Sequence, residues 1–177
     1  MEQVGYDTYC KLLDEVVKEM QGIEVAKEED VQIDIAVSSY IPDEFIESSA
    51  QKIEIYQNIA LCRTEEDIQN VIDEIIDRFG SIPKEVENLI EVARIKNIAR
   101  KVGITKISEK QDGIMFIYDS QKFNTESIST LVEKYGSTLK FSPGYATLKI
   151  NKISDKQILE DIKEYLMSNF VDEKLDE

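Results

Sequence analysis

The polar residues best placed to do chemistry lie in one stretch in the first half of the chain. They follow one another at spacings of three, four and three residues: Asp67, Asn70, Glu74 and Asp77. This spacing places them on one face of a helix. Carboxylates in such a row can bind arginine side chains of a partner through charge-assisted hydrogen bonds. The same row can instead be a solvated helix face, with Glu74 and Arg78 forming an i,i+4 ion pair along it.

Several other kinds of chemistry are excluded by residue types. Histidine is absent, so there is no imidazole metal ligand and no Ser-His or Cys-His nucleophile. Cys10 and Cys62 are isolated, which predicts core thiols in a reducing cytoplasm rather than a disulfide framework. No glycine-rich nucleotide motif or EF-hand spacing occurs. We therefore expect no cofactor and no metal site, and no enzyme activity for this chain.

A second candidate is a cluster of basic residues, Arg94, Lys96, Arg100 and Lys101, in a stretch from 92 to 108 that holds no acid. The cluster could contact nucleic acid, but no aromatic residues are interleaved with it. It could equally complement the negative C-terminus of its own helix or a neighbouring acidic helix. Direct DNA binding is therefore not expected. A pair of carboxylates acting as acid and base is a weaker candidate still, because no tryptophan is present to line a sugar site.

The net charge of −15 is placed unevenly. Residues 1 to 91 hold 23 of the 36 acidic residues and only 7 of the 21 basic ones. An acidic surface repels phosphates and attracts basic protein patches, although it can also serve solubility alone. No apolar run is long enough to span a membrane, and the first residues do not resemble a signal peptide. These features predict a cytoplasmic domain that contacts other proteins.

The secondary-structure elements predicted to position these residues are mainly helices in the first part of the chain and hairpins with helices in the second. Residues 1–30 predict a leading helix over 4–20 and a charged linker. Residues 31–103 predict a short strand over 33–37 and three helices; Ser48 or Ser49 caps the first, and the middle one is capped by Thr64 and ended by Gly80. Residues 104–170 predict two β-hairpins, each followed by a helix, within the same compact domain, and 171–177 predict a frayed tail. The first hairpin begins with a strand over 104–107, the helix after it is capped by Asn124 and runs to 135, and Ser154 caps the last helix. The expected fold class is α+β: a helical acidic N-terminal half, then a small β-β-α-β-β-α sheet-and-helix unit.

Four blocks of the sequence carry a resemblance. Residues 74–83 read EIIDRFGSIP, and the helix after them contains VENL and ARIK before Val-Gly-Ile at 102–104. Earlier blocks are GYDTYCKLL at 5–13, and YIPD at 40–43 with EIY at 54–56. The chain resembles the C-terminal domain of the bacterial transcription-repair coupling factor, whose family carries an ELIDRFG-x-LP segment and an NLL-x-LARLK helix.

The resemblance implies a function that composition alone does not give. A member of this family is a multidomain, ATP-driven double-stranded DNA translocase that removes stalled RNA polymerase and recruits nucleotide-excision repair. Its C-terminal domain folds back on an N-terminal module that resembles a repair helicase subunit, and masks the surface that binds the damage-recognition ATPase. Carried over, the acidic contacts of that domain are Glu74 and Asp77. The alternative is an adaptor that binds an external repair or transcription protein through the acidic half.

Overall fold

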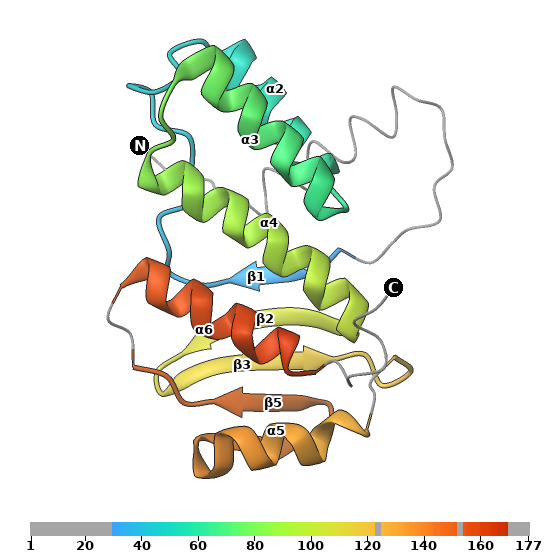
Figure 1. The fold of residues 1–177 in the computed structure, drawn as a ribbon. Coiled ribbons are helices and arrows are strands. Elements are labelled where there is room, and N and C mark those ends of the chain that lie inside the picture. Colours follow the sequence, from blue (N-terminus) through green and yellow to red (C-terminus); the bar gives the residue numbers. More distant parts are fainter. Residues whose placement is uncertain (1–29, 123–124, 152–153, 170–177) are drawn as a thin grey trace. The chain divides into compact units, whose positions relative to one another are not determined.

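The computed structural model describes residues 30–122, 125–151 and 154–169, and within them helices and a sheet form an α+β fold (Figure 1). The elements are β1 (Gln32–Asp34), α2 (Ser49–Leu61), α3 (Glu65–Phe79), α4 (Lys84–Val102), β2 (Ile104–Lys110), β3 (Gly113–Tyr118), α5 (Ser127–Tyr135), a 3-10 turn (Gly136–Thr138), β4 (Leu139–Ser142), β5 (Tyr145–Leu148) and α6 (Asp155–Met167). The helix predicted over 4–20 and the tail 171–177 lie outside the described residues.

The described chain forms two compact units. The first contains residues 38–94, with α2, α3 and the beginning of α4. The second contains residues 30–37 and 95–169, with the end of α4, the sheet, α5 and α6. The division falls within α4, between Arg94 and Ile95.

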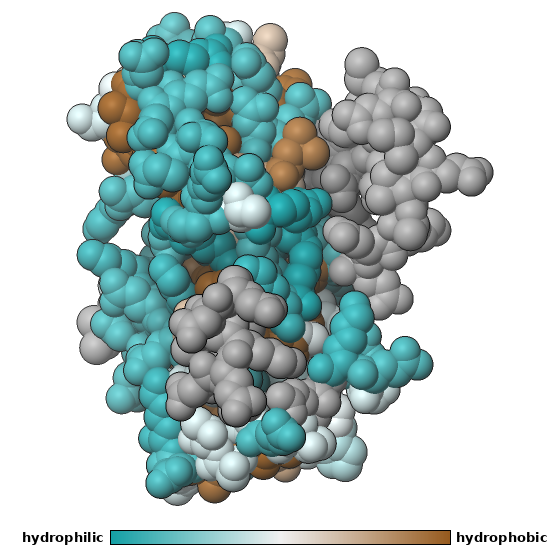
Figure 2. All heavy atoms as spheres, turned by 45° about the vertical axis from the view of Figure 1, so that its right-hand side comes forward, coloured by the Kyte–Doolittle hydropathy of each residue, from teal (hydrophilic) through white to brown (hydrophobic). Residues whose placement is uncertain are grey.

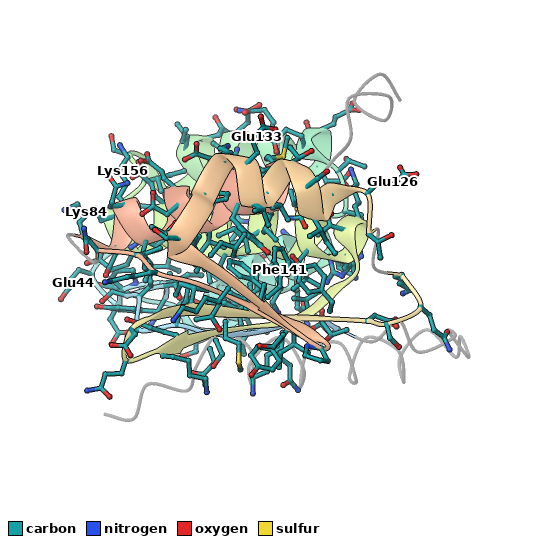
Figure 3. All side chains as sticks on the ribbon, turned by 90° about the horizontal axis from the view of Figure 1, so that it is seen from below. Glu44, Lys84, Glu126, Glu133, Phe141 and Lys156 are labelled. Carbon is teal, nitrogen blue, oxygen red and sulfur yellow. The ribbon has the colours of Figure 1, made fainter. Side chains whose placement is uncertain are left out.

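The sheet of the second unit has five strands in the order β1-β2-β3-β5-β4. β1 pairs parallel with β2, and every other pairing is antiparallel. Seen edge-on, α5 and α6 lie on the same side of this sheet, and Phe141 points from the sheet toward them (Figure 3). Alternation along the strands directs the buried side chains to that side, among them Ile107, Ile114, Phe116, Ala146 and Leu148.

The core of the second unit contains a small polar network among apolar side chains. Phe116 of β3 stacks on Tyr165 of α6, with ring centroids 4.0 Å apart. The hydroxyl groups of Tyr118 and Tyr165 share a hydrogen bond, and Tyr118 donates to Asn169 Oδ1 at 3.1 Å. Because each of these buried polar groups has a partner, the network ties β3 to the end of α6 without leaving a hydroxyl unpaired.

Three helices begin as the sequence predicts. Ser48, Thr64 and Ser154 each accept a hydrogen bond from the backbone N–H three residues later, which caps α2, α3 and α6. The helix predicted over 124–135 is shorter: α5 begins at Ser127 after a residue with no side-chain cap. The cap expected at Asn124 lies outside the described residues.

Two strands differ from the prediction in length. The strand predicted over 33–37 ends at Asp34, and the Val37 amide beyond it donates to the Ile35 carbonyl at 3.0 Å instead of to a neighbouring strand. The strand predicted over 104–107 continues to Lys110, which pairs with Gly113 at the hairpin turn. A side chain on Gly113 would place its Cβ 2.1 Å from the Leu148 carbonyl oxygen, so glycine is required where β3 meets β5.

Candidate docking face on helix α3

Helix α3 is strongly amphipathic, and this fixes which of its side chains face outward. Ile68 and Ile75 are buried, with exposed fractions of 3% and 0%. Asn70 and Asp77 are exposed, on the opposite side of the helix. Three acids in the first turn and Arg78 in the last turn complement the helix dipole. The apolar stripe therefore anchors α3 in the first unit and presents an acidic face away from it.

Glu74 is held in place by two neighbours. Asn58 of α2 donates from Nδ2 to Glu74 Oε2 at 3.3 Å, and Arg78 Nη1 donates to Glu74 Oε1 at 3.1 Å. Arg78 also donates to both carboxylate oxygens of Glu54 on α2, at 3.1 and 3.4 Å. These hydrogen bonds, first with Glu54 and then with Glu74, raise the pKa of Arg78. Glu74 thus enters any contact already oriented, with about a third of its side chain exposed.

Asp77 differs from Glu74 because no neighbouring side chain of the described residues orients it. Its side chain is exposed, and within the described part of the chain no hydrogen bond or ion pair reaches its carboxylate. Asn70 lies seven residues earlier, two turns away on the same face, and is also exposed. The outward side of α3 therefore includes the oriented carboxylate of Glu74, the exposed carboxylate of Asp77 and the amide of Asn70.

Asp67 has a structural role in the N-terminal cap of α3. Its Oδ2 accepts hydrogen bonds from the backbone amides of Arg63 and Thr64, each at 3.0 Å, while Thr64 Oγ1 accepts from the Asp67 amide at 3.1 Å. This is a reciprocal capping box. The backbone hydrogen bonds hold the pKa of Asp67 below its ordinary value of 3.8. The carboxylate closes the start of α3, at the far end of the helix from Asp77.

Comparison with known proteins gives this face a family context. The sequence model of the TRCF domain family matches residues 35–128, which is more than half of the chain. The chain belongs to the TRCF domain family. Over 168 residues it is 31% identical to the transcription-repair-coupling factor of Staphylococcus epidermidis and 28% identical to that of Rickettsia prowazekii. These alignments cover 92% and 94% of this chain, but the chain spans only 14% and 15% of those relatives.

A solved structure supports the same fold. The crystal structure of the C-terminal domain of a transcription-repair coupling factor superposes with a TM-score of 0.71. The match covers 79% of this chain and 91% of that one, at 22% sequence identity. The α+β architecture of the TRCF domain is therefore shared, and α3 with its acidic face lies inside the range that the family model matches.

The basic cluster of this TRCF domain is not a free basic surface. Arg94 forms a bidentate contact with Glu65, with an Nη2–Oε1 distance of 2.7 Å, and also pairs with Glu91. Lys96 and Arg100 both pair with Asp30, at 3.6 and 2.8 Å. Burial alone would raise the pKa of Asp30, but the positive charges of Lys96 and Arg100 hold it below its ordinary value.

These pairings decide against the nucleic-acid hypothesis for the cluster. That hypothesis needs the four cations exposed together, yet the Lys96 side chain is only 5% exposed and the Arg94 side chain 19%. Of the four, only Lys101 is classed as exposed. Arg94 pairs with Glu65 of the neighbouring acidic helix, as one of the two alternatives supposed, whereas Lys96 and Arg100 pair with Asp30, which lies outside the helices.

Within the described residues there is no group of three metal-ligating side chains, and no helix there is long and apolar enough to cross a membrane. Burial raises the pKa of the Cys62 thiol to about 11, with the Asp67 carboxylate adding to the rise. A thiol of this kind is not activated as a nucleophile. The face shown in Figure 2 is mainly hydrophilic, with hydrophobic residues in small groups.

The sequence analysis missed the contribution of α2. Glu54 and Asn58 lie 24 and 16 residues before their partners Arg78 and Glu74. No local spacing signals a pairing over such a separation. The one available signal is that both are polar residues four positions apart in a helix that must pack beside α3, so that they share one face.

Proposed function

We propose that this TRCF domain is a non-catalytic regulatory domain of an ATP-dependent DNA translocase that couples transcription to repair. In this proposal it folds back on the N-terminal repair-like module of the same parent protein, in the cytoplasm. There it masks the surface that binds the damage-recognition ATPase of excision repair. The observation that carries the proposal is the oriented, acidic outer face of α3, with Glu74 held by Arg78 and Asn58 and with Asp77 exposed.

The geometry supports recognition of arginines. A carboxylate fixed by two hydrogen bonds loses little conformational entropy on binding, and a guanidinium can donate to it and to a neighbouring carboxylate together. Asp77 supplies that second carboxylate, three residues after Glu74 on the same outer side. The partner surface that fits best is therefore basic, with arginines spaced to reach both positions.

A contact inside one protein can be weak and still hold. Interfaces between domains of one chain bury roughly 600 to 1,500 Å², and the tether supplies a high effective concentration. A closed state of this kind opens when RNA polymerase or DNA binds the open state more tightly. This mechanism makes the repair surface available only when the translocase is engaged.

Calorimetric titration of this chain with the separately expressed N-terminal module tests the proposal. We expect binding that weakens between about 0.1 M and about 1 M salt, as the Debye length falls from about 10 to about 3 Å. The double variant Glu74→Lys, Asp77→Lys is expected to bind at least about tenfold more weakly, because two charge-assisted contacts become repulsive. In the full-length parent, the same variant is expected to raise affinity for the repair ATPase.

A matched control separates this site from net charge. Glu133 of α5, which is labelled in Figure 3, and Glu160 of α6 are exposed acids of the second unit. The double variant Glu133→Lys, Glu160→Lys changes the net charge equally and is expected to leave binding nearly unchanged. Equal weakening in both double variants would remove Glu74 and Asp77 from the mechanism. Binding to polymerase but not to the module would instead favour an external adaptor.

A further inference from the structure

Helix α2 carries apolar side chains on two opposite sides. Ile55 and Ile59 are buried in the first unit, with exposed fractions of 0% and 3%. Ile53 and Leu61 are 39% and 50% exposed. A surface helix of a globular protein normally keeps its outward side polar, and an apolar second side indicates a second contact. α3 also exposes one apolar side chain, Ile76, at 50%.

The two exposed residues belong to one stripe. They are eight positions apart, with Gln57 midway, so successive members are four residues apart and lie on one side of the helix. At 1.5 Å per residue they are separated by about 12 Å along the axis. This distance is comparable to the width of one helix of a partner, so a single partner element can cover both.

The stripe borders the oriented carboxylate of α3. Glu54 directly follows Ile53 and pairs with Arg78, and Asn58 directly follows Gln57 and donates to Glu74. A residue and its successor are about 100° apart around a helix. The apolar stripe therefore begins beside the seam at which α2 meets α3, next to the acids that the proposed partner contacts.

We propose that the partner surface that binds Glu74 and Asp77 also covers Ile53 and Leu61 with apolar side chains. The inference rests on the proposed function and defines the partner further: a protein surface with arginines opposite α3 and an apolar ridge opposite α2. The argument for this occupant is the continuity of the stripe with the acidic face. A basic side chain directed at Glu74 brings the partner's own surface against α2.

The charged and apolar parts of such an interface make different contributions. The acids orient the partner and speed its association, and they lose strength at high salt. The apolar stripe adds salt-resistant affinity and a negative heat-capacity change on binding. A residual affinity that persists at about 1 M salt is therefore expected in the wild-type chain and reduced in variants of the stripe.

The test is the titration with the N-terminal module, repeated with the double variant Ile53→Gln, Leu61→Gln. Glutamine favours helix, so the variant keeps α2 intact, which circular dichroism verifies. The side chains of Ile53 and Leu61 are each roughly half exposed, so a partner can bury them further. We therefore expect the double variant to bind about tenfold or more weakly in total, and we expect the same loss of affinity at high salt. The control Val132→Gln changes an α5 residue with 47% exposure and is expected to bind as wild type.

Each outcome is decisive. Wild-type binding that responds to Glu74→Lys, Asp77→Lys but not to Ile53→Gln, Leu61→Gln would overturn the inference and leave the proposed function standing. Absence of wild-type binding, together with an unchanged affinity of the full-length parent for the repair ATPase in both double variants, would overturn both. Analytical ultracentrifugation of the chain alone tests whether the stripe instead binds a second copy of the chain. Self-association that the stripe variant abolishes would assign the stripe to that second copy and overturn the inference.

Discussion

Replacing Thr64 by alanine should destabilise the chain without changing its docking face. The Thr64 hydroxyl accepts one hydrogen bond, from the Asp67 amide at 3.1 Å, and this bond satisfies one of the free N–H groups at the start of α3. Alanine removes that acceptor and keeps the Asp67 carboxylate, which still accepts from two backbone amides. The perturbation is therefore confined to half of the capping box.

The expected loss of stability follows from the measured effects of removing helix N-caps. Loss of a Ser, Thr, Asn or Asp cap lowers stability by about 1 kcal/mol. With a urea slope of about 2 kcal/mol per molar, the unfolding midpoint moves down by about 0.5 M. Thr64→Ser keeps the hydroxyl, so it should lose only a small part of this. Glu74 and Asp77 lie about three and three and a half turns after Thr64, so binding to the module should not change.

Urea unfolding, followed by circular dichroism, measures the loss of stability in Thr64→Ala. The calorimetric titration measures its binding to the N-terminal module. The reasoning is refuted if Thr64→Ala leaves the midpoint unchanged, or if Thr64→Ser lowers it equally. Weakened docking by Thr64→Ala, at a temperature where the variant is folded, would show that the start of α3 belongs to the interface. Ser154→Ala removes an equivalent 3.1 Å cap from α6 and provides a matched comparison in the second unit.

Two further predictions concern pH and the second core. The folded-state pKa of Asp67 is lowered, so the ionised carboxylate stabilises the fold fully when the pH is above the ordinary pKa of 3.8. This contribution is lost as the pH falls through the lowered pKa. The unfolding curves of wild type and Asp67→Asn should therefore differ at neutral pH and converge in acid. Tyr165→Phe removes the hydroxyl that pairs with Tyr118 in the core and should cost about 1 kcal/mol in urea unfolding. Tyr145→Phe, at a 40% exposed position, is the control, and an equal effect of both variants would contradict the role of the buried network.

Local signals in the sequence account for most helix boundaries. A hydroxyl before an acid-rich turn and a glycine after the last apolar residue define α3 by themselves, and Gly80 has φ of +92°, which glycine adopts without strain. Strand boundaries were less accurate. β2 extends through Ser108, Glu109 and Lys110, which carry no alternating apolar signal, because pairing with β3 rather than side-chain character sets its length.

Long-range pairing explains what the sequence could not provide at the site. The spacing of Asp67, Asn70, Glu74 and Asp77 correctly placed one helix face, but it treated the four as equivalent. The structure separates them by their partners: Asp67 caps its own helix, and Glu74 is oriented from α2. Whether Glu74, Asp77, Asn70 and Arg78 bind a partner stays a prediction until the titration is made.

The guanidinium group of Arg78 is engaged by side chains of its own unit, although Arg78 belongs to the proposed docking face. Its guanidinium donates to Glu54 and Glu74 and lies 5.0 Å from the centroid of the Phe79 ring, so its donors are largely used within the unit. Its charge also offsets one of the two carboxylates beside it, which would otherwise repel each other across the seam. A lysine at this position would keep the charge but lose the two-sided fork. The arginine of the EIIDRFG segment therefore orients Glu74 and ties α2 to α3 through its hydrogen bonds to Glu54 and Glu74.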